Sequence, residues 1–242
     1  MARRRKKVTA ARVEGSRATS RDKIIGAFLA LLAEKRFEQI ELAEVAARAG
    51  ISLAVLREEF GSTLAILAAH MREIDRAVLA GIDKDMADEP ARERLFDVLM
   101  RRLELLEPHK EAVRSLMRSA LRNPPLALAL NALAVRSQQW MLAAARIGAA
   151  GPIGQVRAQG LALLFANVLR TWVDDHEPGL PRTLAALDRA LASGERWGRF
   201  LDDLCTLPQR ICPSRGPQTE ARGRGGGRGQ RPRRGGDAAM AA

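Results

Sequence analysis

The stretch Glu44–Phe60 reads EVAARAGISLAVLREEF, and it decides the fold that this sequence predicts. Apolar side chains recur at spacings of three and four on both sides of Gly50, which indicates two short helices joined by a tight turn. Gly50 can take a left-handed backbone conformation at the turn, and the Ser52 hydroxyl can cap the helix that follows. On this second helix Leu56 and Phe60 face the core, so the rest of its surface faces outward.

A longer helix is expected ahead of this stretch, and the connection continues its apolar surface. Thr19 or Ser20 can cap the free amide groups at its start. Its inward stripe consists of Ile24, Ile25, Phe28, Leu29, Leu31 and Leu32, followed by Phe37 and Ile40 in the connection. A short helix over 41–49 then turns Leu42 and Val45 inward.

The composition favours an all-α protein with about nine to ten helices. The 242 residues are 47% apolar and 4% aromatic with no Tyr, while Ala, Leu and Arg, which favour helices, dominate. After residue 61, helices are expected over 62–86, 91–107, 110–122, 126–147, 155–175, 181–193 and 195–206, with GAAGPIG as a loop before residue 155. The fourth of these begins LALALNALAV and is apolar nearly all round, which predicts that it runs through the middle of a second domain.

The net charge of +12 belongs to the two ends of the chain. Residues 1–21 carry +7 and residues 208–242 carry +6, which leaves the part between them at −1. Both ends have little to bury, so we expect a disordered basic arm over 1–19 and a disordered Arg/Gly-rich tail over 208–242. Two interpretations stay open: solubilising ends, or a nonspecific grip on a polyanion whose affinity falls steeply with salt.

No pattern in the sequence indicates catalysis, a metal or a cofactor. Cys205 and Cys212 lack the CxxC spacing of zinc and redox sites, and the three histidines are scattered. The cluster DDHE at 174–177 precedes Pro-Gly and is better explained as a polar helix end. The longest stretch without a charged residue has 13 residues, where a membrane span needs about 20. MARRRKK is not followed by the apolar core of a secretory signal, so we expect a soluble cytoplasmic protein that is not an enzyme.

One ordered set of residues carries a family resemblance: Phe28, Leu32, Phe37, Ile40, Val45, Ala46, Ala49, Gly50, Ile51, Ser52, Leu56, Phe60, Ser62 and Leu67. With these, residues 20–70 closely resemble the N-terminal DNA-binding domain of TetR/AcrR-family transcriptional regulators. The resemblance implies a helix-turn-helix domain over 20–70 and a helical effector-binding and dimerisation domain over 71–207. It also implies that the helix after Gly50 enters the major groove and that a homodimer binds a palindromic operator in double-stranded DNA. A ligand-responsive repressor is the function that follows.

The resemblance assigns roles around the helix-turn-helix. The scaffold comprises Val45, Ala46, Gly50, Ile51, Ser52, Leu56 and Phe60, and the DNA contacts comprise Leu53, Ala54, Val55, Arg57, Glu58 and Thr63. Arg57 can pair with a phosphate or a guanine edge, and Glu58 can accept a hydrogen bond from cytosine. The chain departs from the family at Glu59 and Thr63, where residues that contact phosphate are common. In an alternative interpretation, Glu58 and Glu59 form a solvated helix face with Arg57.

The resemblance further implies an effector pocket and a dimer interface in the second domain. The candidate lining for a small apolar effector is Leu99, Leu103, Leu116, Met117, Leu130, Trp140 and Phe165, with Arg102, Gln138, Gln139 and Asn167 as polar anchors. The candidate dimer contacts are Leu161, Leu164, Val168, Trp172, Leu184, Leu187 and Leu191. Both sets also match plain core, because an apolar stripe at helical spacing often packs within its own protomer.

The second domain bears another resemblance that keeps a different function open. The segments RRLELLEPHKEAVRSLM, RNPPLALALNALAVRSQQW and LRTWVDDHEPG make residues 95–205 loosely similar to ubiquinone-biosynthesis lipid-binding proteins of TetR-like fold. That resemblance implies an accessory protein that binds an isoprenoid lipid and no longer reads DNA specifically. A function without DNA binding would account for the two adjacent carboxylates, Glu58 and Glu59, on the helix after Gly50.

Overall fold

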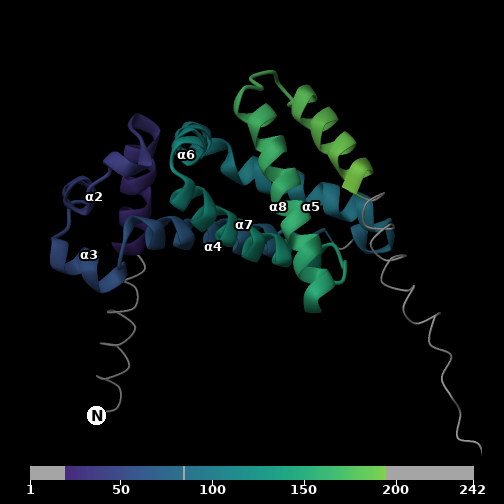
Figure 1. Cartoon of the computed structure of the whole chain (residues 1–242), viewed down its shortest axis with the longest axis horizontal. Helices are drawn as coiled ribbons and strands as arrows, with labels where there is room; N and C mark the ends of the chain where they lie inside the picture. The colour runs from purple at the N-terminus through teal and green to yellow at the C-terminus, as the bar shows by residue number, and fades with distance from the viewer. Residues whose placement is uncertain (1–19, 84, 195–242) are drawn as a thin grey trace, which may run out of the picture. The chain divides into compact units, whose positions relative to one another are not determined.

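The structure is a computed structural model that describes residues 20–83 and 85–194, and within these residues it contains helices and no strands (Figure 1). The elements in chain order are a first helix over 20–34, η1 Phe37–Gln39, α2 Leu42–Ala49, α3 Leu53–Glu59, α4 Thr63–Ala80, η2 Asp85–Asp88, α5 Ala91–Leu106, η3 Glu107–His109, α6 Lys110–Arg122, α7 Pro124–Ala144, α8 Gly151–Val173 and a last helix over 181–194. The all-α prediction is therefore confirmed. The helix expected over 195–206 and both predicted tails lie outside the described residues.

The chain divides into two compact units, residues 1–202 and 203–242, and every described residue belongs to the first. That unit contains two apolar cores. The first core gathers the inward stripe of the first helix with Val45, Leu56 and Phe60, and the second gathers side chains of α5, α7, α8 and the last helix. Helix α4 contributes to both, since Ile66 packs in the first core and Val78 in the second, each fully buried. This helix therefore couples the helix-turn-helix to the rest of the unit.

Several helix ends differ from the sequence prediction, each for a local reason. Helix α4 ends at Ala80 rather than near residue 86, because Gly81 caps it and donates its N–H to the carbonyls of Ala77 and Val78. Helix α7 begins at Pro124, slightly earlier than predicted. Helix α8 begins at Gly151, four residues before the predicted start at Gln155, within a segment that was expected to be a loop. In both helices a proline occupies the first turn, where its missing N–H leaves no hydrogen bond unmade.

Helix α7, which contains LALALNALAV, packs against α4, α5, α6 and α8, in agreement with the predicted central position, but it is not buried all round. Leu128 is 72% exposed on α7, and Trp140 near the other end of the helix is 56% exposed. The apolar side chains that α7 does bury, Leu126, Met141 and Leu142, fall on one side. Among the described residues, no helix is both long and apolar enough to cross a membrane.

Candidate nucleic-acid interface

The turn between α2 and α3 is built by backbone conformation and two caps. Gly50 has φ 66° and ψ 36°, the left-handed conformation, and the N–H of Ile51 donates to the carbonyl of Ala46 at 3.1 Å. This arrangement satisfies carbonyl groups that the end of α2 would otherwise leave unpaired. Ser52 then caps α3, because its Oγ accepts a hydrogen bond from the N–H of Val55 at 3.3 Å.

The same geometry fixes which side of α3 faces out. Leu56 is 1% and Phe60 4% exposed, and Val45 and Ala46 of α2 are buried beside them. Of the other residues, Leu53 at the start of the helix is 53% exposed, and Ala54, Arg57 and Glu58 are exposed as well, whereas Val55 and Thr63 are half-buried. The six predicted DNA contacts are therefore brought together around one short helix, and four of them form its open face.

Glu59 lies outside that open face because it is bound internally. Its Oε2 is 3.2 Å from Nη1 of Arg21 on the first helix, and its side chain is only 10% exposed. The Arg21 guanidinium also lies 4.5 Å above the centre of the Phe60 ring. The ion pair and the cation–π contact tie α3 to the start of the first helix. The alternative of a solvated face shared by both glutamates therefore does not hold for Glu59.

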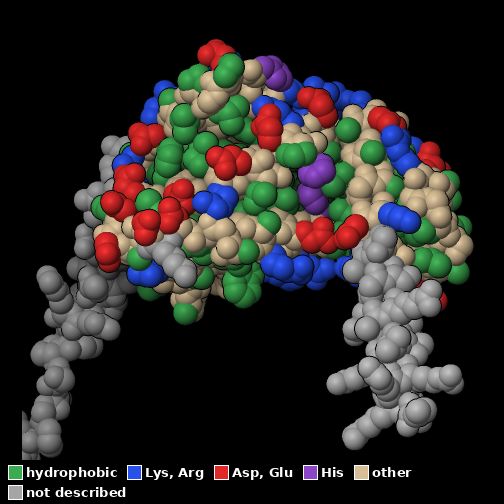
Figure 2. Space-filling view, turned by 180° about the vertical axis from the view of Figure 1, so that it is seen from behind, with side chains coloured by type: hydrophobic (Ala, Val, Ile, Leu, Met, Phe, Trp, Pro, Cys, Tyr) green, Lys and Arg blue, Asp and Glu red, His purple; other side chains and the backbone are tan. Residues whose placement is uncertain are grey.

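Two other cations of this region, Arg48 and Lys35, are paired with carboxylates. Arg48 binds Glu34 through two nitrogens, at 2.6 and 2.7 Å, and Lys35 binds Glu44 at 2.5 Å. These hydrogen bonds hold the pKa of both glutamates below the usual range. On the face drawn in Figure 2, charged side chains lie in several small groups, with acidic ones toward one end and a row of basic ones along the lower edge, and apolar side chains lie between them. The surface around the helix-turn-helix thus offers little excess charge of its own.

The second core encloses a polar cluster made of Asp75, Arg102 and Ser137, and Gln138 is buried next to Ser137 on α7. Arg102 Nη1 donates to Asp75 Oδ1 at 2.5 Å and to Ser137 Oγ at 2.7 Å, and Ser137 Oγ donates to Asp75 at 2.6 Å. Burial lowers the pKa of Arg102, and Asp75 opposes that shift. Gln138 is 1% exposed, and within the described residues its Oε1 has no hydrogen-bond partner. Two of the four predicted polar anchors, Arg102 and Gln138, therefore lie inside the protein, while Gln139 is half-buried and Asn167 exposed.

The predicted effector-pocket residues are not brought around one cavity. Leu99, Leu103 and Phe165 are buried in the second core with Met117 packed against it, Leu116 and Leu130 pack against the first core, and Trp140 is largely exposed. Two pockets occur elsewhere in the described part of the chain. One of about 480 Å³ lies between the first helix and α6, and one of about 200 Å³ lies beside Ile82 and Arg94. None of the predicted residues lines either pocket.

The predicted dimer contacts divide into two groups. Leu161, Val168, Trp172, Leu187 and Leu191 are at most 6% exposed and belong to the protomer's own second core, so their assignment to a surface is corrected. Leu164 and Leu184 are half-buried. The apolar side chains that α8 turns outward are Ile153, Val156 and Leu163, at 38%, 53% and 61% exposure. The sequence predicted the apolar spacing within each helix correctly. It did not reveal that this apolar side packs inside the protomer instead of facing a partner.

The predicted polar residues of the DDHE segment are not arranged as a metal site in the described residues. Within them no group of three or more His, Cys, Asp or Glu side chains is placed to hold a metal ion. The carboxylates of the DDHE segment have other partners: Asp174 binds Arg114, and Asp175 Oδ2 accepts from both the N–H and the hydroxyl of Thr183, each at 2.8 Å. Cys205 and Cys212 lie beyond the described residues.

Comparison with solved structures identifies the architecture. A TetR transcriptional regulator from Nitrosomonas europaea ATCC 19718 superposes with a TM-score of 0.58 over 72% of this chain and 97% of its own, at 22% identity. A TetR transcriptional regulator from Rhodococcus sp. RHA1 gives 0.53 over 74% and 97%, also at 22% identity. A putative TetR-family regulator from Rhodococcus sp. gives 0.51 over 72% and 97%, at 21% identity. The chain has the TetR fold.

At this identity the likeness extends to the TetR fold and not to its ligands. Comparisons with protein-family models and with curated proteins return no match. Two features of this version of the TetR fold were missed from the sequence. The Arg21–Glu59 pair joins residues 38 positions apart, and the larger pocket joins the first helix to α6. Neither leaves a local pattern in the sequence, because both depend on how helices pack.

Proposed function

We propose that this protein is a transcriptional regulator that binds double-stranded DNA through α3, acting as a homodimer on a palindromic operator. The observation that carries the proposal is the arrangement of α3: Leu56 and Phe60 hold one side down, and Leu53, Ala54, Arg57 and Glu58 face outward. A short helix presented in this way after a tight turn suits the major groove. The TetR fold, shared with solved proteins described as transcriptional regulators, supports it.

Arg57 is the exposed cation of α3 and the residue we assign to base or phosphate recognition. The same open face offers Leu53 and Ala54 to thymine methyl groups, and Glu58 to the amino group of cytosine. The position of Glu59 favours the DNA-binding function over the lipid-binding alternative. Its carboxylate is paired with Arg21, so its negative charge no longer argues against a DNA phosphate near α3. Glu58 alone is then compatible with base recognition.

The test is a gel shift and footprint on the DNA upstream of the protein's own gene, over several salt concentrations. Unlabelled scrambled duplex in excess separates sequence preference from nonspecific attraction to the basic ends. We expect Arg57→Ala to weaken specific binding by about tenfold or more, in line with ~1–3 kcal/mol for a base-contacting arginine. The matched control is Arg48→Ala, an exposed arginine of α2 that is paired with Glu34. Unchanged preference after Arg57→Ala would exclude this contact, and no preference in the wild type would reject the proposal.

We further propose that an effector binds within the second core, at the polar cluster of Arg102, Asp75 and Ser137 and the neighbouring Gln138. Buried polar atoms without partners are costly, and Gln138 Oε1 and His70 Nε2 are both in this position among the described residues. Neither of the two pockets described above reaches these atoms, so a mostly apolar ligand with a polar group for each of them would have to open the core to bind. Mass spectrometry of a solvent extract of the purified protein identifies such a ligand. A prenyl lipid there, together with no sequence preference for DNA, would support the lipid-binding function instead.

A further inference from the structure

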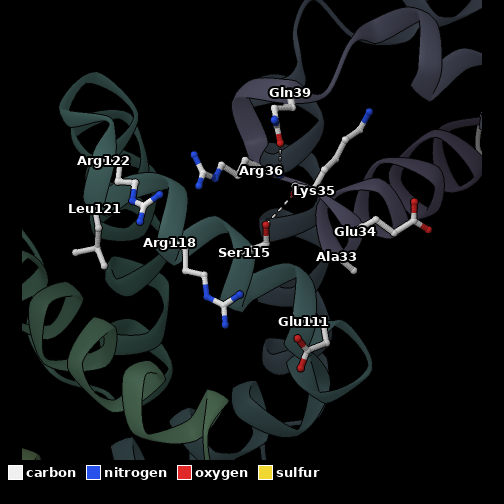
Figure 3. Close-up of a pocket in the computed structure, with 10 residues that line it drawn as sticks. All are labelled: Ala33, Glu34, Lys35, Arg36, Gln39, Glu111, Ser115, Arg118, Leu121 and Arg122. Carbon is white, nitrogen blue, oxygen red and sulfur yellow. Dashed lines mark hydrogen bonds between the residues drawn. The ribbon is translucent and has the colours of Figure 1, made fainter.

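The larger pocket lies where the first helix and η1 meet α6 (Figure 3). It has a volume of about 480 Å³ and is lined by Ala33, Glu34, Lys35, Arg36, Gln39, Glu111, Ser115, Arg118, Leu121 and Arg122. That volume falls in the range of small-molecule sites. The pocket lies at the opposite end of the first helix from Arg21, which contacts α3.

The charges around the pocket leave it positive. Both acids of the lining are engaged by cations that lie outside it: Glu34 by Arg48, and Glu111 by Arg114 at 3.3 Å. Among the lining cations, Lys35 is neutralised by Glu44. Arg118 and Arg122 form no ion pair within the described residues, and Arg36 is exposed.

The unpaired cations come from both sides of the pocket. Arg36 and Arg122 extend toward one another across it, whereas Arg118, one helical turn before Arg122 on α6, extends toward the Glu111 end of the pocket (Figure 3). The facing guanidinium groups of Arg36 and Arg122 repel each other, and this repulsion is relieved when an anion lies between them. The planar, multidentate guanidinium is also the side chain best matched to carboxylate and phosphate oxygens.

The pocket adjoins the hydrogen bonds that hold α6 to the end of the first helix. Ser115 Oγ donates to the carbonyl of Lys35 at 2.8 Å, and the N–H of Phe37 donates to Ser119 Oγ at 3.1 Å. Asn123 Nδ2 donates to Glu38 Oε1 at 3.2 Å. A ligand that bridges Arg36 with α6 therefore binds both partners of this junction at once.

We propose that the pocket is a binding site for a small organic anion carrying carboxylate or phosphate groups, held by Arg36, Arg118 and Arg122. Binding there strengthens the junction between the first helix and α6. The first helix in turn supports α3 through Arg21 and Glu59. If the proposed DNA-binding function holds, the anion adjusts operator affinity through this connection, separately from any ligand of the second core.

The test measures hydrogen exchange by mass spectrometry on the full chain, with citrate or inorganic phosphate as the probe and sodium chloride at equal ionic strength as the reference. We expect either probe to slow exchange in two segments, 33–39 and 111–122, because it bridges them. Arg118→Gln/Arg122→Gln should raise the probe concentration needed for this protection about tenfold or more, because two of the charge-assisted hydrogen bonds to the anion are lost. Citrate protecting alone assigns a carboxylate ligand, and phosphate protecting alone assigns a phosphate ester.

The matched control is Arg72→Gln/Arg76→Gln, an exposed arginine pair with the same spacing on α4, outside the pocket. It should leave the protection unchanged. The proposed site is rejected if neither probe slows exchange in the two segments, or if the Arg118/Arg122 variant is protected as strongly as wild type. Binding of the probe to the basic ends of the chain does not count as support. Hydrogen exchange needs no DNA, so it can succeed when the gel shift fails. A gel shift with and without the effective probe then tests the coupling.

Discussion

At the scale of single residues, Asp75 and Arg102 form an ion pair that the second core removes from water. Their exposures are 6% and 4%, and Ser137 bonds to both. A buried pair gives up much of its hydration, so its net contribution to stability is modest, whereas removing one partner leaves an uncompensated charge inside the core.

Asp75→Asn should therefore lower the free energy of unfolding by about 3–5 kcal/mol. The double variant Asp75→Asn/Arg102→Met, which removes both charges, should be clearly less destabilised than the sum of the two single variants. Urea denaturation of all three variants measures this coupling. Strictly additive losses would mean that the two charges do not depend on one another.

His70 gives the molecule a specific pH dependence. Burial, with the nearby His109 and Arg102 as smaller causes, lowers the pKa of His70 from its ordinary 6.5 to about 4. The two imidazole rings meet edge to face at 4.9 Å between centroids. Between pH 6.5 and 4 the unfolded chain binds a proton at this residue and the folded chain does not, so stability is full above pH 6.5 and falls as the pH drops toward 4.

His70→Phe should flatten this part of the stability profile by up to about 3 kcal/mol between pH 6.5 and 4, since one pKa unit corresponds to ~1.4 kcal/mol. Phenylalanine keeps a flat ring beside His109. Denaturant midpoints at a series of pH values measure how stability changes with pH. Subtracting the variant's curve from that of wild type cancels the contribution of the carboxylates, which both proteins share. A slope identical to wild type would show that His70 does not titrate in this way.

At the scale of helices, α8 depends on a close backbone approach at its start. Gly154 is buried, and a Cβ added there would lie 2.1 Å from the carbonyl carbon and oxygen of Ala149. Backbone cannot move aside as a flexible side chain can. Gly160, two turns later on the same helix, is exposed and has open space around its Cβ position.

Gly154→Ala should lower the free energy of unfolding by about 1–3 kcal/mol through this overlap. Gly160→Ala, the matched control, should raise it by about 0.5–1 kcal/mol, because alanine favours a helix interior more than glycine does. Thermal unfolding of both variants decides the matter. If both substitutions raise the free energy of unfolding, helix propensity alone governs α8 at these positions.

The helix bounds show how much of the secondary structure the sequence predicted. Helices α2 and α6 agree with their predicted ranges, 41–49 and 110–122, to within one residue, and α3 begins directly after its predicted cap, because Gly50, Ser52 and the Asn-Pro-Pro segment are strong local signals. The start of α8 was missed, because Gly and Pro in GAAGPIG suggest a loop unless the proline falls in the first turn. The end of α4 was placed too late, since its apolar pattern continues past Gly81.

At the scale of the whole molecule, the proposed homodimer needs an apolar surface. The outward face of α8, with Ile153, Val156 and Leu163, is the surface we assign to it, since most of the predicted interface is already buried in the protomer. Burying such a face stabilises a complex by about 25 cal/mol for each Å² of apolar area.

Val156→Asp/Leu163→Asp should therefore convert the dimer to a monomer, because paired carboxylates would meet across the two-fold axis. Leu121→Asp is the control: it replaces a leucine on α6 that is still more exposed, at 74%. Sedimentation equilibrium gives the mass of each variant. A wild-type monomer, or a dimer that survives the double substitution, would place the interface elsewhere or remove it.

The sequence by itself determined the all-α class, the turn at Gly50 and the buried side of α3, because these depend on residues within a few positions of one another. Tertiary structure alone decided that Glu59 is occupied by Arg21, that the leucine stripes of α8 and the last helix fill the protomer's own core, and that Arg36 lies near Arg118 and Arg122 around a pocket. The physical reason is the range of the interactions. A helical period shows that a face is apolar, but only the packing of distant helices determines what covers that face and which charges meet.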